Sequence, residues 1–249
     1  MLCFVYQLVC LLTPHLTHVV ATPRLFSVPT IQTLLRLNGT QARPVSNVSI
    51  INIGFRDASP TYMEPHGVPS GGDWALERTA ALFASGTSGL TVSKCEFYRN
   101  DGNGLMVSGY ARDAVLSENE FAWTGGTAMA AWGYTDELSD GGVHGWDGTK
   151  GDHPYNTVVH GNVIRETGIW TKQSSCWFQA KTAKTTLTNN ICYNLARAGF
   201  NFNDGFGGGD YVAHNLVFNS CREVSAASRV ASPCERFLAT PRARAPRCS

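Results

Sequence analysis

The chain has 249 residues, of which 43% are hydrophobic and 16% are charged, so it can bury a substantial core under a lightly charged surface. Its formal net charge of +1 argues against a nucleic-acid-binding protein, because phosphate recognition needs a strongly basic surface. The 25 glycines predict many tight turns, more than a helical protein requires.

Residues 1–21, MLCFVYQLVCLLTPHLTHVVA, form an apolar run that ends on a small residue, as a secretory signal peptide does. Proline and histidine residues interrupt the run and no positive charge precedes it, so an apolar N-terminal cap is the alternative. The run is too short and too broken to predict a membrane span. The N-glycosylation triplets at Asn38 and Asn47 agree with a secreted, extracellular chain.

The eight cysteines are scattered, and no two of them form a Cys-x-x-Cys pair, so we predict no zinc site. Two lie in the leader and two in the C-terminal tail. The other four lie in strand-like segments, where we expect buried, inert thiols and at most one or two disulfides: Cys95, Cys176, Cys192 and Cys221.

A repeat is the strongest signal in the sequence. Five stretches share an apolar second and seventh residue and an Asn or Cys at the fifth: TVSKCEF (91–97), VLSENEF (115–121), VVHGNVI (158–164), TLTNNIC (186–192) and YVAHNLV (211–217). The fifth-place column is Cys95, Asn119, Asn162, Asn190 and Asn215, and SIINIGF (49–55) adds Ile53. Intervals of 24 to 28 residues predict one coil of a β-solenoid, and two longer intervals predict a coil with an insertion. We expect the Asn side chains to hydrogen-bond from coil to coil.

A second short strand follows each repeat after a Gly- or Asn-rich break: GLMVS (104–108), TAMAAW (127–132), SCWFQAK (175–181) and GFNFND (199–204). Period-two alternation assigns one set of side chains to the core: Leu105, Val107, Ala128, Ala130, Cys176, Phe178, Phe200 and Phe202. It assigns the other set to the outer face: Met106, Ser108, Met129, Ala131, Trp177, Gln179, Lys181, Asn201 and Asn203. Helical spacing of apolar residues is suggested only over Pro29 to Leu37, which could cap the first coil.

These repeats and turns resemble those of right-handed parallel β-helix proteins, the pectate-lyase-like fold, over about residues 45–223. The resemblance implies an all-β, single-stranded, right-handed parallel β-helix (a solenoid) of about 6–7 coils. We place this domain at residues 30–223 and expect an irregular, disordered tail rich in Arg, Ala and Ser at 224–249. The fold hosts lyases, hydrolases, epimerases and non-enzymatic adhesins, so it does not define the reaction.

Two irregular insertions interrupt the coils, at residues 57–78 and 133–156. Long loops on a solenoid usually project from one side and often carry function. In the first insertion, Glu64-Pro65-His66 is faintly similar to the Asp-Pro-His motif of alginate C5-epimerases, although a Glu stands where Asp is expected. Three further residues either complete a wall of the site or anchor the insertion: Asp73, Trp74 and Arg78.

The glycine-rich stretch GFNFNDGFGGGDYVAHN (199–215) departs from nucleotide-binding motifs. It lacks the last glycine of the dinucleotide fingerprint, the Walker lysine and a following helix. A calcium-binding nonapeptide repeat would require tandem copies, which are absent from the sequence. We interpret Gly205 to Gly209 as a corner with positive φ angles.

Polar and aromatic residues on two adjacent coils form a predicted carbohydrate surface, because sugar rings stack on aromatic faces and amides bond to hydroxyls. A solvated strand surface is the alternative. The predicted substrate-binding residues are Trp177, Gln179, Asn201 and Asn203, with Trp146, Asp147 and Asp152 from the second insertion.

Lyase chemistry on a uronate requires a base, an acid and a cation that neutralises the carboxylate, which Lys181 with His144 or His153 could supply. Hydrolysis requires two carboxylates about 5 to 10 Å apart, which Asp204 and an Asp of the second insertion could supply. The predicted catalytic residues are Lys181, Asp204, His144, His153 and His66.

We therefore predict a secreted carbohydrate-active protein, a lyase, epimerase or hydrolase that acts on an acidic polysaccharide. Its partner would be a polysaccharide or glycan, with no nucleic acid and no stable membrane insertion. No cofactor or metal site is predicted, although carboxylates of the second insertion could hold calcium. The alternative is a non-catalytic β-helix surface or adhesive protein that binds a glycan or a protein.

Overall fold

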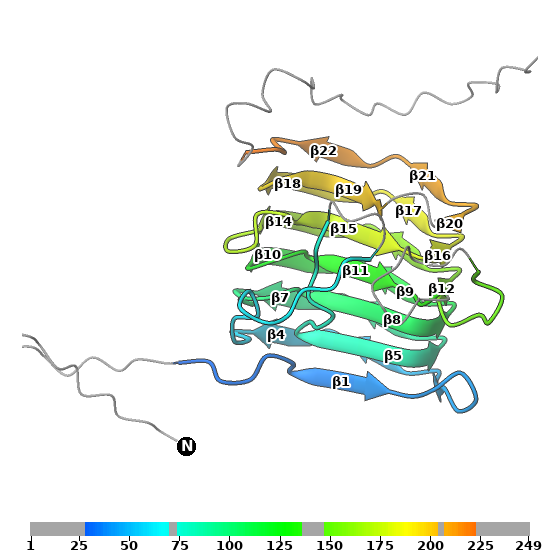
Figure 1. Cartoon of the computed structure of the whole chain (residues 1–249). Helices are drawn as coiled ribbons and strands as arrows, with labels where there is room; N and C mark the ends of the chain where they lie inside the picture. The colour runs from blue at the N-terminus through cyan, green and yellow to red at the C-terminus, as the bar shows by residue number, and fades with distance from the viewer. Residues whose placement is uncertain (1–27, 70–73, 136–146, 204–206, 223–249) are drawn as a thin grey trace, which may run out of the picture.

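The computed structural model describes residues 28–69, 74–135, 147–203 and 207–222. These residues form six stacked coils, and their strands line up in three parallel sheets along the solenoid (Figure 1). Among the described residues, no helix is long and apolar enough to cross a membrane.

Sheet A carries the second strand of each repeat and is the longest of the three sheets. Its strands are β1 (Leu35–Asn38), β2 (Val45–Ser46), β5 (Leu82–Ser88), β8 (Leu105–Arg112), β11 (Met129–Trp132), β12 (Pro154–Tyr155), β15 (Ser175–Ala180), β16 (Thr182–Ala183), β19 (Ala198–Phe202) and β20 (Gly207–Gly208).

Sheets B and C carry the two halves of the seven-residue repeat, with six short strands each. Sheet B consists of β3 (Ser49–Ile51), β6 (Thr91–Ser93), β9 (Val115–Ser117), β13 (Val158–His160), β17 (Thr186–Thr188) and β21 (Tyr211–Ala213). Sheet C consists of β4 (Gly54–Arg56), β7 (Glu96–Tyr98), β10 (Glu120–Thr124), β14 (Val163–Thr167), β18 (Ile191–Leu195) and β22 (Leu216–Phe218).

The predicted asparagine ladder between sheets B and C is confirmed. Nδ2 of Asn119 donates to Oδ1 of Asn162 at 3.0 Å, and Asn162 and Asn190 each donate to the next Asn at 2.9 Å. The same Oδ1 atoms also accept a backbone N–H from the coil below. Each side chain therefore replaces the hydrogen bonds that the tight turn removes from the backbone.

The alternation predicted for the strands of sheet A is right for two of its four segments and wrong for the other two, 127–132 and 175–181. Leu105 and Phe200 face the core as predicted, but in the coils between them Met129 and Trp177 occupy the same inward column. The reason is a corner: Cys176 and Trp177, consecutive in sequence, both pack inward, which shifts the alternation by one residue. The outer face therefore carries Met106, Ala130, Phe178 and Asn201.

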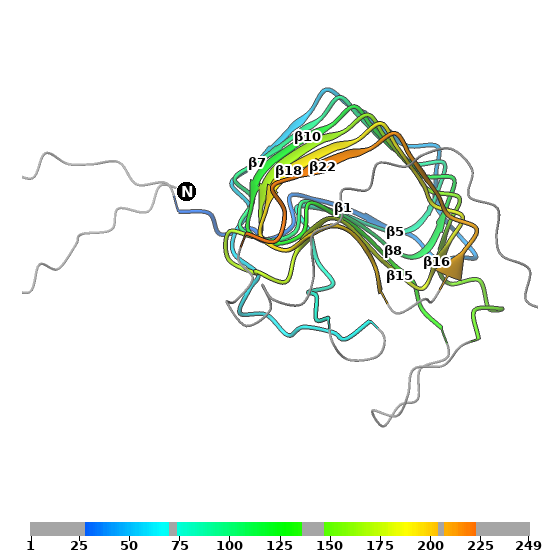
Figure 2. The ribbon, with the colours of Figure 1, turned by 90° about the horizontal axis from the view of Figure 1, so that it is seen from above.

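The first insertion covers this outer face. We call its described residues, 57–69 and 74–78, together with the two residues that follow, the strap. It runs outside sheet A (Figure 2) and packs Trp74 and Leu76 on the outer apolar side chains of the sheet. The ring of Trp74 stacks on Phe178 with 6.0 Å between centroids. Burial of this second cluster is what holds the strap on the solenoid.

A left-handed bend follows the first part of the sheet A strands. Gly86 and Gly109 adopt φ angles of 61° and 60° there, and Lys181 takes the same conformation at 55° in the fifth coil. In the fourth coil the second insertion leaves the solenoid at this bend, between β11 and β12. The insertion is thereby placed beside Lys181.

Other sequence predictions have mixed outcomes. Pro29 to Leu37 is not helical, since its last residues belong to β1, which pairs in parallel with β5. Gly207 and Gly209 have the positive φ angles expected of a corner, 150° and 74°, although Gly207 and Gly208 also form the short strand β20.

The cysteines of the strand-like segments differ in burial. Cys95, Cys176 and Cys192 are buried free thiols, whereas Cys221 is only partly buried. Burial raises the pKa of the Cys176 thiol well above its usual value, as expected of an inert thiol.

Candidate functional site

Gly133, at the start of the second insertion, contacts three residues at the bend: His153, Lys181 and Arg78. A Cβ placed on Gly133 would lie 2.5 Å from the Cβ of His153 and would overlap the carbonyl oxygen of Lys181. The Gly133 carbonyl accepts a hydrogen bond from Nη2 of Arg78 at 3.3 Å. Only a glycine allows these groups to approach so closely.

Arg78, on the strap, is clamped between two aromatic rings. Its guanidinium carbon lies 3.7 Å from the ring centroid of Trp132 and 4.0 Å from that of Tyr134. Nη1 also donates to Oγ of Ser108 at 2.8 Å and to the carbonyl of Trp132 at 3.0 Å. These contacts fix a cation next to Tyr134, whose ring is partly exposed.

Asp152 and His153 close the same site from the other end of the insertion. The Asp152 carbonyl accepts the N–H of Tyr134 at 2.7 Å, and a Cβ on Gly109 would lie 3.0 Å from Oδ1 of Asp152. Burial, and then the charge of Arg112, lower the pKa of His153, while Asp152 acts in the opposite direction. His153 is therefore neutral at neutral pH and can accept a proton.

Arg112 holds the insertion against the bend. It donates to the carbonyls of His153 and Gly151 and lies 4.3 Å from the ring centroid of Tyr110. Because its guanidinium is occupied by these backbone oxygens, Arg112 positions the insertion.

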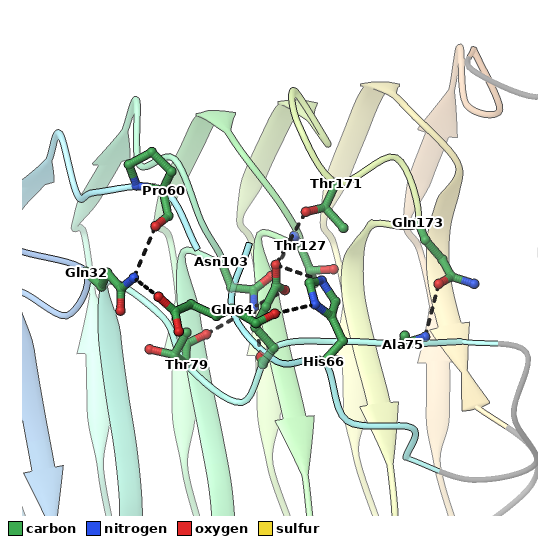
Figure 3. Close-up of polar contacts among 11 residues, drawn as sticks. Gln32, Pro60, Glu64, His66, Ala75, Thr79, Asn103, Thr127, Thr171 and Gln173 are labelled. Atoms are coloured by element: carbon green, nitrogen blue, oxygen red, sulfur yellow. Dashed lines mark hydrogen bonds and ion pairs between the residues drawn. The ribbon is translucent and has the colours of Figure 1, made fainter. Parts of the chain in front are cut away.

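His66 lies on the strap. Its Nε2 lies 3.0 Å from Oε1 of Glu77, and its Nδ1 lies 2.8 Å from the carbonyl oxygen of Glu64 (Figure 3). Glu77 is only 2% exposed and is anchored to the solenoid through Asn103 and Thr171, before β8 and β15. Both ring nitrogens of His66 are thus occupied by contacts that fasten the strap.

His66 fastens the strap next to the site at the bend. The residue after it, Gly67, packs directly on the ring of Trp132, over which the guanidinium of Arg78 lies. Glu77, which contacts His66, is the residue before Arg78. Glu64, which the similarity to the Asp-Pro-His motif singled out, accepts a hydrogen bond from Gln32 at 2.8 Å.

The predicted outward carbohydrate patch is wrong in its central member. Trp177 is 0% exposed and lies in the main core, with its Nε1 donating to Oε1 of Gln179 at 2.9 Å. Gln179 and Asn203 are also buried, and Gln179 donates to Asp210. Asn201 does face outward, in the column of Phe178. These side chains therefore do not form a continuous sugar-stacking face.

The remaining predicted site residues divide between the insertion and the undescribed segments. Lys181 is 3% exposed and lies beneath the insertion beside His153. Asp147 is exposed, and its Oδ1 accepts the backbone N–H of Thr149, which closes a turn. His144, Trp146 and Asp204 lie outside the described residues.

The sequence does not predict Tyr134, Ser108 or Glu77 as site residues. The signal that it offers for the cation–aromatic contact is Arg78, in an insertion that also contains aromatic residues. Within the part of the chain that the structure describes, no group of three or more His, Cys, Asp or Glu residues could hold a metal ion.

Parallel coils and an internal asparagine ladder define a β-solenoid. Residues 80–231 match the family model described as "Right handed beta helix region", and the chain belongs to this family. The right-handed parallel β-helix predicted from the repeats is thereby confirmed. No curated protein sequence matches the chain.

A solved structure described as "Glycoside hydrolase" is similar to this chain, with 13% sequence identity and a TM-score of 0.36. The match covers 82% of this chain and 53% of the other, so the chain spans about half the length of that protein.

Proposed function

We propose that this protein is a carbohydrate-active β-helix protein that acts on an acidic polysaccharide at the bend formed by Gly133 and Lys181. The observation that carries the proposal is the meeting of Arg78, His153 and Lys181 around Gly133. It places the cation of Arg78, the backbone of Lys181 and a neutral histidine beside one glycine. A cluster of ionisable groups in which one has a shifted pKa, here His153, is typical of active sites.

The cation of Arg78 favours an acidic ligand. Arg78 is held in a fixed orientation by Ser108, two backbone carbonyls and two rings, so it contributes a fixed positive charge at the bend that attracts a carboxylate. Lys181 is buried, with its backbone carbonyl oxygen against Gly133. Tyr134 is 38% exposed and offers a surface for the apolar side of a sugar.

Proton abstraction next to the uronate carboxylate is the chemistry that these residues support best. His153 would take the proton from the ring carbon that bears the carboxylate, and Arg78 would stabilise the charge that develops on the carboxylate. In elimination, the C–H electron pair forms a double bond in the ring as the glycosidic C–O bond at the neighbouring carbon breaks, and the leaving oxygen takes a proton from water. In epimerisation, water donates a proton to the opposite face of the same carbon, and His153 releases the first proton to solvent.

A non-catalytic glycan- or protein-binding solenoid is the second candidate. The strap favours it, because Trp74 and Leu76 occupy the outer face of sheet A and leave no long open groove on the described part of that face. A binding protein would use the aromatic and cationic groups at the bend without turnover.

The proposal is tested by incubating the protein with a panel of uronate polymers. Absorbance of unsaturated products detects elimination, and proton NMR of the sugar rings detects epimerisation. Either product supports the proposal, and binding without any product supports the second candidate. Neither binding nor product with any acidic polymer would overturn both.

A further inference from the structure

A second aromatic surface lies away from the bend, where the strap meets the loop between β14 and β15. Trp170 on that loop is 52% exposed and Tyr62 on the strap is 45% exposed. Their ring centroids are 6.2 Å apart, with 38° between the ring planes. In Figure 1 the loop and the beginning of the strap project from the same edge of the solenoid. We call Trp170, Tyr62 and Asp101 the aromatic shelf.

Trp170 is held rigidly although its ring is exposed. Its Nε1 donates to Oδ1 of Asp101 at 3.0 Å, and its backbone N–H donates to the carbonyl of Gly125 at 3.0 Å. A Cβ on Gly125 would lie 2.8 Å from Cδ1 of the indole, so the ring packs directly on this glycine. The polar edge of the indole is therefore satisfied within the protein, and an apolar surface of the ring is left to solvent.

Tyr62 is held by its neighbours on the strap. Thr61 is buried, and a Cβ on Gly102 would lie 2.6 Å from its Oγ1. The carbonyl of Thr61 accepts the N–H of Glu64 at 2.8 Å, which closes a turn around Tyr62. Both rings are thus presented on fixed backbone, so a ligand would meet a preformed surface.

The ring separation distinguishes between ligand classes. At 6.2 Å with a tilt of 38°, the rings contact each other, and no ligand fits between them. The pair is a shelf and not a cage, which excludes the enclosed binding of an organic cation. A shelf of two rings with a carboxylate at its edge suits a flat ligand that has an apolar face and hydroxyls at its rim.

We propose that the aromatic shelf is a carbohydrate-binding site for the uncharged pyranose rings of a glycan. The C–H face of a sugar would stack on Trp170 and Tyr62, and the Asp101 carboxylate would accept a hydrogen bond from a sugar hydroxyl. The carboxylate makes the shelf unfavourable for a uronate, whereas the site at the bend is cationic. The shelf also precedes β15 while Lys181 follows it, so the two sites lie at opposite ends of this strand. The shelf would anchor a neutral part of the polymer.

The test is isothermal titration of the full chain with hexasaccharides of glucose, mannose, galactose and xylose, followed in parallel by tryptophan fluorescence. At least one neutral oligosaccharide should bind and change the fluorescence. Trp170→Ala should weaken that binding about tenfold or more, the scale of a central aromatic contact, and Trp170→Phe should restore part of it. Tyr211→Ala is the matched control, because Tyr211 is 59% exposed on sheet B, away from the shelf.

Two results would overturn the proposal: no binding of any neutral oligosaccharide, or equal affinities for the wild type and Trp170→Ala. Thermal unfolding of each variant shows whether the fold is kept. Turnover of short uronate oligomers separates this inference from the proposed function, since Trp170→Ala should leave it unchanged. A protein that binds no neutral oligosaccharide but turns over uronate oligomers refutes the shelf alone. A protein that binds neutral oligosaccharides but turns over no uronate refutes the proposed function alone.

Discussion

Nε2 of His66 lies 3.0 Å from Oε1 of Glu77, on facing arms of the strap. The arms are paired by the antiparallel bridge between Gly67 and Leu76. Because Nδ1 of His66 faces the carbonyl oxygen of Glu64, Nδ1 donates a hydrogen bond to it and Nε2 is left to face the carboxylate of Glu77. This contact ties the two arms, and Asn103 and Thr171 tie Glu77 to the coils beneath.

Glu77→Ala should therefore loosen the strap. The change removes the carboxylate that His66 and Thr171 contact, whereas Asn103 keeps the carbonyls of residue 77 and Thr79 as acceptors. It should lower the free energy of unfolding by about 1–3 kcal/mol. Hydrogen exchange should increase at the amides of Gly67 and Leu76 before it increases in the core strands. Glu64→Gln, at an exposed position, is the control. Unchanged exchange in Glu77→Ala would show that apolar packing alone holds the strap.

The asparagine ladder should matter most in its middle. Asn162→Ala removes the acceptor of two N–H groups of Asn119 and should cost at least about 2 kcal/mol in urea denaturation. Asn215→Ala, in the last described coil and only half-buried, should cost less because water can replace the lost bonds. Equal losses for the two variants would contradict this account of the ladder.

Trp177 should behave as a core residue. Trp177→Ala should lower the free energy of unfolding by about 3–5 kcal/mol, because it opens a large cavity among packed side chains. Trp170→Ala, which removes an exposed ring, should cost far less. Chemical denaturation of both variants measures the two free energies of unfolding. A small decrease for Trp177→Ala would contradict the buried position and support the outward orientation that alternation predicts.

His153 should make the protein less stable at acid pH. Burial and Arg112 lower the pKa of His153 in the folded state from its ordinary value of 6.5. The unfolded chain therefore binds a proton at a higher pH than the folded one, so stability is lost as the pH falls from 6.5 through the lowered pKa. His153→Gln should reduce this loss, whereas His160→Gln, on β13, controls for the general effect of removing a histidine. Identical pH profiles for the wild type and His153→Gln would refute the assignment.

The sequence predicts the solenoid well because each coil repeats one local pattern. The residues before the ladder positions show this: Lys94, Glu118 and Asn189 all adopt φ angles of 56° and turn the chain at the same point of successive coils. Such a turn depends on a few neighbouring residues, and it recurs at the interval at which the asparagines recur. The spacing therefore identifies both the turn and the ladder.

The site could be predicted only in part. Placing the second insertion near Lys181 followed from chain order, since the insertion lies in the coil that precedes β15. The prediction that Trp177 faces outward is wrong because Cys176 and Trp177 both point inward at a corner. The sequence of this segment looks the same as that of a strand with strict alternation, so the corner cannot be recognised from it. The contact of Glu77 with Thr171 joins residues 94 positions apart through the strap, and no local pattern predicts it.

The proposed function is tested most directly by the initial rate of product formation from a uronate polymer at neutral pH. His153→Gln should abolish most of the rate while binding of the polymer persists, because the variant loses the base and keeps Arg78 and Lys181. His160→Gln should react at the wild-type rate. A wild-type rate for His153→Gln would contradict the account, and so would a complete absence of product from the wild type with every uronate polymer.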